Sequence, residues 1–109
     1  VVFVTGYPVF TGKRLVRLES IQHVDANGDY AEIHAADGDY TLRASLAHLE
    51  EDWGPAGFTR VHRTHLVNLA HAIELRSLPN GTAVLSLRDG TEIPVARRTV
   101  AALRRRLKA

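Results

Sequence analysis

The sequence predicts a mainly β protein that carries one or two short helices. Three dipeptides typical of tight turns, Asp37-Gly38, Asn80-Gly81 and Asp89-Gly90, separate apolar runs that have the length of β-strands. Two segments instead repeat their apolar residues at helical spacing. The chain has 109 residues, of which 45% are hydrophobic, so it is large enough to close one core. We therefore expect a single domain over residues 1–109.

The expected strands fall into two groups, one on each side of the first helical segment. In the first group, apolar and polar residues alternate in part, as they do in strands with one buried face. These runs cover residues 15–18, 21–24, 30–35 and 40–43. In the second group, strands and tight turns follow one another directly. These runs cover residues 72–75, 83–87 and 91–95.

Residues 45–53 and 99–108 fit short amphipathic helices. The apolar residues that share one face are Leu46, Leu49 and Trp53 in the first segment, and Val100, Leu103 and Leu107 in the second. The first segment stops at Gly54-Pro55, because proline cannot continue a helix. Thr99 can cap the second segment, whose last turns carry several basic residues that suit the helix dipole.

The net charge of +2 hides an uneven distribution along the chain. Residues 1–54 hold four basic and nine acidic residues, a net charge of −5. Residues 55–109 hold ten basic and three acidic residues, a net charge of +7. A basic half of this kind indicates an anionic partner, with nucleic acid before a membrane surface.

The chain contains no cysteine, which excludes disulfides, thiolate metal ligands and a cysteine nucleophile and suits a cytoplasmic protein. No apolar run approaches the roughly 20 residues of a membrane-spanning helix. The sequence has no methionine and starts inside an apolar run, Val1-Val2-Phe3-Val4, without the pattern of a signal peptide. We expect a domain excised from a longer protein.

A polar cluster interrupts the apolar residues of segment 58–69, which reads as a strand, a bend and a strand. The cluster consists of Arg60, His62, Arg63, Thr64 and His65. Side chains of these types donate hydrogen bonds to phosphate oxygens and to base edges. A second basic site, Arg97-Arg98, lies where the last strand meets a helix, and a helix N-terminus favours anions.

Three motifs, in the right order, resemble the LytTR family of DNA-binding domains. The family pattern is close to RxHRSxLVN followed by LxDGxxIPVSRR. Residues 61–68 read VHRTHLVN, and residues 85–98 read LSLRDGTEIPVARR. Upstream, residues 21–30 read IQHVDANGDY and resemble the family segment IxYIEAxGNY. The resemblance covers nearly the whole chain.

The resemblance implies an elongated stack of small antiparallel sheets with about ten short strands. It also implies that three loops enter the major groove of double-stranded DNA, namely residues 27–30, residues 60–64 and Arg97-Arg98. The candidate DNA-binding residues are Asn27, Tyr30, Arg60, His62, Arg63, Thr64, Arg97 and Arg98. Among these, Arg63 and one of Arg97 and Arg98 are expected at base edges. The remaining residues of the second loop are expected at phosphates.

Members of the family typically form the output half of bacterial response regulators in two-component systems. They usually bind pairs of direct repeats about one helical turn apart. The resemblance therefore implies two copies on DNA, with dimerisation supplied by an upstream domain. The sequence departs from the family pattern at Thr64, which keeps the usual hydroxyl, at Ala96, which removes one, and at Asp29, which replaces an amide with an acid.

The polar residues also allow interpretations other than DNA binding. His62, His65 and His71 lack cysteine or acidic ligands nearby, and residues three apart in a strand face opposite sides, so we expect no metal and no cofactor. We find no catalytic motif and do not expect an enzyme. The alternative is a small β module that docks a protein or an anionic ligand through its basic C-terminal half.

Other polar and aromatic residues have structural interpretations. The run Arg104-Arg105-Arg106 is more typical of a solvated helix end than of a phosphate grip. Trp53 and Phe58 are expected as core anchors, and Tyr40 as a cross-strand packing residue. Asn68 stands inside an apolar strand, so its side chain should satisfy backbone groups.

Overall fold

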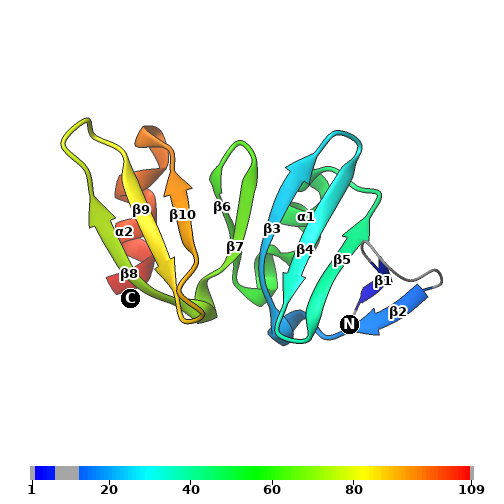
Figure 1. Ribbon diagram of the computed structural model, residues 1–109. Coiled ribbons are helices and arrows are strands. Elements are labelled where there is room, and N and C mark those ends of the chain that lie inside the picture. Colours follow the sequence, from blue (N-terminus) through cyan, green and yellow to red (C-terminus); the bar gives the residue numbers. More distant parts are fainter. Residues whose placement is uncertain (1, 7–12, 109) are drawn as a thin grey trace.

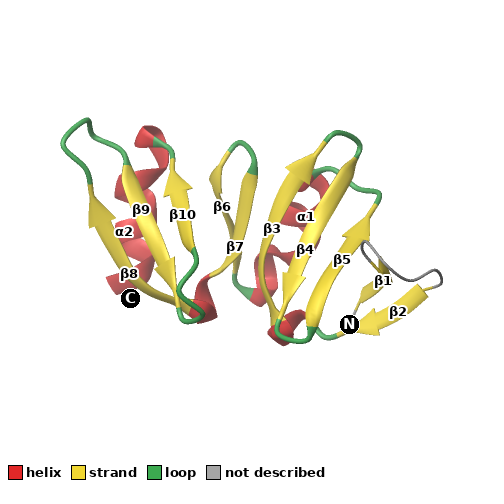
Figure 2. Cartoon of the chain, viewed as in Figure 1, coloured by secondary structure: helices red, strands yellow, loops and turns green. Residues whose placement is uncertain are grey.

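A computed structural model describes residues 2–6 and 13–108, and Val1 therefore lies outside the described residues. The first sheet contains β1 (Val2–Gly6), β2 (Lys13–Val16), β3 (Ile21–Asn27), β4 (Tyr30–Ala35), β5 (Gly38–Leu42), β6 (Phe58–His62) and β7 (His65–Asn68). The second contains β8 (Ala72–Ser77), β9 (Ala83–Leu87) and β10 (Glu92–Val95). The helices are α1 (Leu46–Trp53) and α2 (Val100–Lys108) (Figures 1 and 2).

The described strands form two antiparallel sheets placed along one axis of an elongated molecule (Figure 1). The strand orders are β2-β1-β5-β4-β3-β7-β6 in the larger sheet and β10-β9-β8 in the smaller. The molecule measures 44 × 25 × 24 Å. The predictions of a mainly β fold, and of an elongated stack of small antiparallel sheets with two short helices, are confirmed.

Two hydrophobic clusters fill the interior, one beside each helix. Helix α1 covers the first cluster, in which the rings of Trp53 and Phe58 lie 5.3 Å apart and both side chains are buried, as expected for core anchors. Helix α2 contributes Leu103 to the second cluster. That cluster also takes Val61 from β6 and Val67 from β7. The β6–β7 hairpin therefore belongs to the larger sheet and packs into the core of the smaller one.

Two element boundaries differ from the predictions. The run expected as a strand over residues 15–18 leaves the sheet at Val16, and Leu18–Ser20 form a 3-10 turn. This turn closes because both the backbone N–H and the hydroxyl of Ser20 donate to the carbonyl of Arg17. The last helix begins at Val100, after a 3-10 turn over Arg97–Thr99. The first helix starts where expected, since the hydroxyl of Ser45 accepts from the backbone N–H of His48.

Asn68 has the structural role that the sequence predicted. Its side chain is buried, and its Nδ2 donates to the carbonyl of Ile21 over 3.1 Å. Its Oδ1 accepts from the backbone N–H of Ala70 over 3.2 Å. The amide therefore ties the end of β7 to the start of β3.

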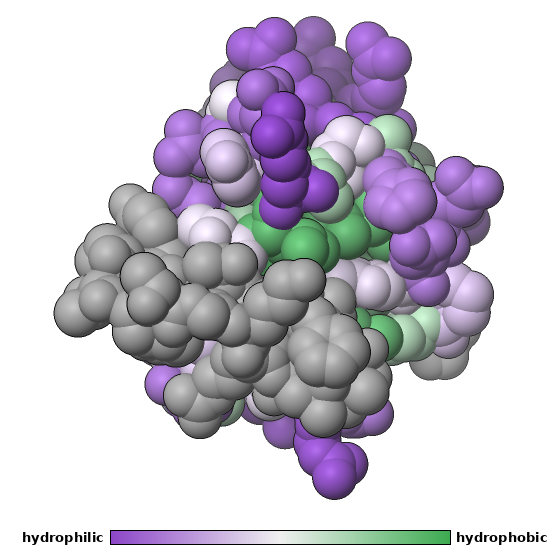
Figure 3. Space-filling view, turned by 90° about the vertical axis from the view of Figure 1, so that its right-hand side faces the viewer, coloured by the Kyte–Doolittle hydropathy of each residue, from purple (hydrophilic) through white to green (hydrophobic). Residues whose placement is uncertain are grey.

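Figure 3 shows the end of the molecule that carries β1 and β2. Outside the grey region, hydrophilic side chains lie at the top, right and bottom of this face, and apolar atoms show near its centre. Within the described residues, neither helix has the length and apolar character needed to cross a membrane.

Candidate nucleic-acid interface

The three predicted loops emerge at one edge of the molecule, which is the upper edge in Figure 1. Two backbone hydrogen bonds join them. The N–H of Ala26 in β3 donates to the carbonyl of Thr64 over 3.0 Å. The N–H of Ala96 after β10 donates to the carbonyl of Val61 over 2.8 Å. The first bond joins residues 38 positions apart in the sequence and the second joins residues 35 positions apart, so the three loops are held side by side.

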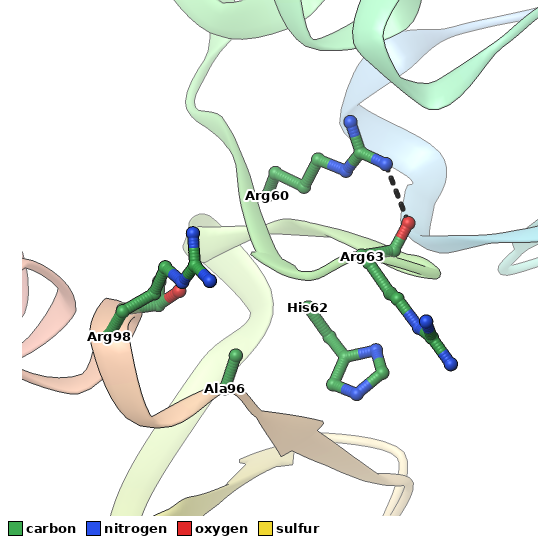
Figure 4. A pocket seen from close by; sticks show the side chains of 6 residues that line it. Arg60, His62, Arg63, Ala96 and Arg98 are labelled. Carbon is green, nitrogen blue, oxygen red and sulfur yellow. Dashed lines mark hydrogen bonds between the residues drawn. The ribbon is translucent and has the colours of Figure 1, made fainter.

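The β6–β7 hairpin has a tight turn whose geometry is fixed by its own side chains. Nη2 of Arg60 donates to the backbone carbonyl of Arg63 over 2.6 Å (Figure 4). Oγ1 of Thr64 lies 2.9 Å from Nδ1 of His62. In contrast, the guanidinium of Arg63 makes no hydrogen bond or ion pair with any described residue. Hydrogen bonds within the turn therefore hold its shape, and the side chain of Arg63 points away from it (Figure 4).

The ring of His62 has a defined orientation. Its Nδ1 lies 3.2 Å from the backbone N of Thr64, which can only donate, so Nδ1 accepts and the neutral ring carries its proton on Nε2. Partial burial, and then the neighbouring His65 and Arg63, lower the pKa of His62. The ring is therefore neutral near pH 7, and its outer nitrogen is available as a donor.

Arg97 and Arg98 have different environments. Nη2 of Arg97 donates to the carbonyl of Asn80 over 2.6 Å. Gly81 adopts a φ of 88°, and a Cβ added there would lie 3.1 Å from Nε of Arg97. Arg97 therefore packs against the β8–β9 turn and holds it. Arg98 forms no such contact within the described part of the chain, and its side chain lies beside the β6–β7 hairpin (Figure 4).

An open groove lies between the β6–β7 hairpin and the segment after β10 (Figure 4). Its lining residues are Arg60, His62, Arg63, Ala96, Arg98 and Thr99. Three of these side chains carry a permanent positive charge and none is acidic. Such a groove attracts anions and offers donors to phosphate oxygens or base edges.

The structure keeps the first predicted loop outside this basic groove. Asn27 uses its Nδ2 to donate to Oε1 of Glu32 over 2.7 Å, and Tyr30 is half-exposed. Both residues line a separate depression together with Glu32 and Thr41. The chain turns sharply at Gly28, whose φ is 59°. Of the predicted site residues, Arg60, His62, Arg63 and Arg98 therefore share one groove, while Thr64, Arg97, Asn27 and Tyr30 do not line it.

Residues 12–108 match the family model of the LytTr DNA-binding domain. The chain belongs to this family. The relative RcoM 2 of Paraburkholderia xenovorans, a heme-containing CO-sensing transcriptional regulator, is 34% identical over 89% of this chain and 38% of its own. The sensory transduction protein LytT of Bacillus anthracis is 29% identical over 86% of this chain and 38% of its own. This LytTr chain thus spans a little over a third of these relatives.

The same fold occurs in a solved structure, the LytTr DNA-binding domain of a response regulator from Bacillus cereus. The TM-score is 0.84, with 22% identity, over 95% of this chain and 93% of that one. At this identity the comparison supports the fold. Family membership makes this chain a DNA-binding domain of the kind found in bacterial transcription regulators.

One pair of histidines in the LytTr domain lies differently from the prediction. His62 and His65 were expected to face opposite sides because they are three positions apart. They are instead paired across the hairpin, with ring centroids 5.4 Å apart. Arg63 and Thr64 form a two-residue turn between the two histidines. Because the chain reverses there, the alternation of side chains along a continuous strand does not apply.

Two further groups in the LytTr domain were missed or misassigned from the sequence. Arg104 and Arg106 donate to the hydroxyls of Ser77 and Thr59, so these two side chains tie α2 to the strands instead of ending in solvent alone. A cluster of histidines around Asp25 was not identified at all. The spacing of His23 and Asp25 could have indicated this cluster, because residues two apart in a strand have their side chains on the same face.

Proposed function

We propose that this domain reads the sequence of double-stranded DNA by placing the β6–β7 hairpin and the segment after β10 in the major groove. The convergence of Arg63 and Arg98 on one groove carries this proposal, because both guanidinium groups are free of partners within the described structure. A free guanidinium can donate two parallel hydrogen bonds to O6 and N7 of guanine. Contacts to phosphates alone would not require two unpaired guanidinium groups, those of Arg63 and Arg98, in the same groove.

The other residues of the hairpin turn have supporting roles in this proposal. Arg60 and Thr64 hold the shape of the turn through the contacts described above, and the remaining Nη hydrogens of Arg60 are expected to reach a neighbouring phosphate. His62 offers Nε2–H to a phosphate oxygen. Together they set the depth and the register of Arg63.

Arg97 is assigned to the fold and Arg98 to the DNA. The guanidinium of Arg97 is occupied by the carbonyl of Asn80, whereas Arg98 lines the groove. The loop of Asn27 and Tyr30 is expected beside the duplex, because the hydrogen bond between Ala26 and Thr64 holds the start of this loop next to the hairpin. An acid at Asp29 fits such a position where it accepts from the amino group of cytosine.

We further propose that the domain is the output part of a longer bacterial regulator that acts in the cytoplasm, where its DNA would lie. Two copies would bind direct repeats about one helical turn apart, with the dimer contacts supplied by another domain of the protein. This proposal is supported by the relatives, in which the matching region makes up 38% of the length. Sedimentation of the isolated domain should find a monomer, and a tight dimer would contradict the division.

The experiment that tests sequence reading is selection of bound duplexes from a random pool, followed by titration of the selected site and a scrambled one across a salt series. We expect an enriched repeated motif, and specific binding some 10³-fold or more above the scrambled duplex. A steep salt dependence without an enriched motif would reduce the groove to a general polyanion site. Absence of binding by a folded sample would favour the docking module considered above.

A further inference from the structure

A second polar cluster lies on the larger sheet, away from the basic groove. His23 and Asp25 share one face of β3, and His34 of β4 is paired with His23 in the register. Val24 and Ile33, which alternate with them, are buried in the cluster beside α1. The polar cluster therefore occupies the opposite face of the sheet, the face that Val67 of β7 shares through its pairing with His23.

The donor atoms of this cluster converge on one point. Oδ1 of Asp25 lies 3.4 Å from Nδ1 of His23, and Oδ2 lies 2.9 Å from Nε2 of His34. One donor atom from each of the three residues lies within 4.8 Å of the others. The two imidazole rings are stacked with centroids 4.3 Å apart, so they approach the carboxylate from the same side.

One of these atoms has no hydrogen-bond partner although it is buried. Nδ1 of His23 is inaccessible, and the residue is only 7% exposed. The 3.4 Å contact to Asp25 is too long for a good hydrogen bond. A buried polar atom without a partner is costly, so its presence calls for a ligand or an ion. Here the atom points at a carboxylate that two other histidines already approach.

We propose that His23, Asp25 and His34 form a binding site for a divalent transition-metal ion of the zinc class. Two imidazole nitrogens and one carboxylate oxygen are a donor set that zinc accepts in sites with an open fourth position. A tetrahedral ion with ligands about 2.0–2.2 Å away holds them roughly 3.3–3.5 Å apart. The 3.4 Å separation between Asp25 and His23 lies in this range, and the 2.9 Å separation between Asp25 and His34 is shorter. Because the two contacts use different oxygens of Asp25, small side-chain rotations would complete the site.

The cluster also has the outer partners that hold the ligands of a metal site in place. Nδ1 of His34 lies 2.9 Å from Oδ1 of Asp39, which fixes the ring so that Nε2 faces the centre. Nδ1 of His65 lies 2.7 Å from Oδ1 of Asp25 and orients the carboxylate. Metal-binding histidines and carboxylates commonly have such outer partners. Asp25 and His34 are half-buried, so an ion and its water ligand have a path to the site.

Zinc chloride titrated into the 109-residue chain by calorimetry tests this inference, at mildly alkaline pH, where protons compete least for imidazole. We expect one ion per chain with a micromolar or tighter dissociation constant. Cobalt(II) should give the visible absorption bands of a tetrahedral ion. Imidazole ¹⁵N spectra should show shifts of Nδ1 of His23 and Nε2 of His34 on adding zinc, with His48 unchanged. This inference is independent of DNA binding.

Three variants separate the site from other histidines. His34→Gln should abolish stoichiometric binding, and Asp39→Asn should weaken it by about 10–100-fold, because it removes an outer partner only. His48→Gln is the matched control, since His48 is exposed on α1 and pairs with Asp52. Absence of one-to-one binding, or zinc that leaves the His23 and His34 resonances in place, would overturn the site. If His34→Gln does not fold, Asp39→Asn and the imidazole spectra of the unmodified chain still decide it.

Discussion

The backbone N–H of Ala96 donates to the backbone carbonyl of Val61 over 2.8 Å, and this bond joins the two segments that carry Arg98 and Arg63. Val61 is fully buried in the core of the smaller sheet, so its carbonyl is held in place by packing. The distance between the two free arginines therefore depends on the contact between the two sheets. The shape of the groove therefore depends on the packing of the whole domain and not on either loop alone.

Ala96→Pro tests this bond with little other disturbance. Ala96 has φ −65° and ψ 145°, which proline adopts without strain, and the preceding Val95 is extended as a pre-proline residue should be. The substitution removes only the N–H, so the free energy of unfolding should fall by about 1 kcal/mol. Affinity for the selected duplex should fall as well. Urea unfolding and fluorescence anisotropy measure both, and Ala96→Ser, which keeps the N–H, is the control. Unchanged affinity in the proline variant would show that the two loops act independently.

Arg97→Ala and Arg98→Ala should have opposite profiles. The first loses the hydrogen bond to Asn80 and should lower the free energy of unfolding by about 1 kcal/mol. The second should leave stability unchanged and weaken the selected DNA site by about 1–3 kcal/mol. Thermal melting and DNA titration of both variants give the comparison. A reversed pattern would assign the base contact to Arg97.

Arg63→Ala should weaken binding to the selected site by about 1–3 kcal/mol and binding to scrambled DNA far less. The reason is that Arg63 occupies the tip of a turn whose shape is maintained by other residues. Arg105→Ala serves as the control, because it removes the same charge from an exposed position on α2. Equal losses on both duplexes would make Arg63 a phosphate contact.

His62 should titrate below the ordinary histidine pKa of about 6.5, because partial burial and the neighbouring His65 and Arg63 disfavour its charged form. A histidine whose pKa is lowered by folding gives stability that is present above its unfolded pKa and is lost as pH falls toward its folded pKa. NMR titration of the ring should find the low midpoint. Between about pH 6.5 and the measured midpoint, stability should fall more in the parent chain than in His62→Gln. Equal pH dependence would remove His62 as the cause.

Asn68→Ala should lower the free energy of unfolding by about 1–3 kcal/mol, because it leaves a buried carbonyl of Ile21 and the N–H of Ala70 without their partner. Chemical denaturation measures the loss. Asn27→Ala is the comparison, since it removes an exposed contact to Glu32 and should cost far less. Similar losses in both variants would contradict the structural role of Asn68.

Local features of the fold were predictable because they depend on neighbouring residues. The turns at Asp37-Gly38, Asn80-Gly81 and Asp89-Gly90 and the first helix, with Ser45 before it, follow from conformational preferences. The strand that was expected to continue to residue 18 ended early because Ser20 closes a turn on Arg17. Such a competition between local hydrogen bonds and strand pairing is not visible in a hydrophobic pattern.

The candidate site was predictable in its residue types and not in its grouping. Arg97 and Arg98 are adjacent in the sequence, and only the position of Asn80, 17 residues upstream, separates their environments. The cluster around Asp25 likewise draws on β3, β4 and β7. Contacts between distant strands depend on register, and register is set by the whole sheet.

The elongated shape of the molecule restricts how two copies can share a duplex. Its longest dimension is 44 Å, whereas one turn of B-form DNA rises roughly 34–36 Å. Two copies centred one turn apart on the same side would overlap if their long axes ran parallel to the duplex. On the proposed direct repeats, neighbouring domains would therefore have to tilt their long axes across the helix. A footprint of one bound copy should accordingly be narrower than the length of the protein.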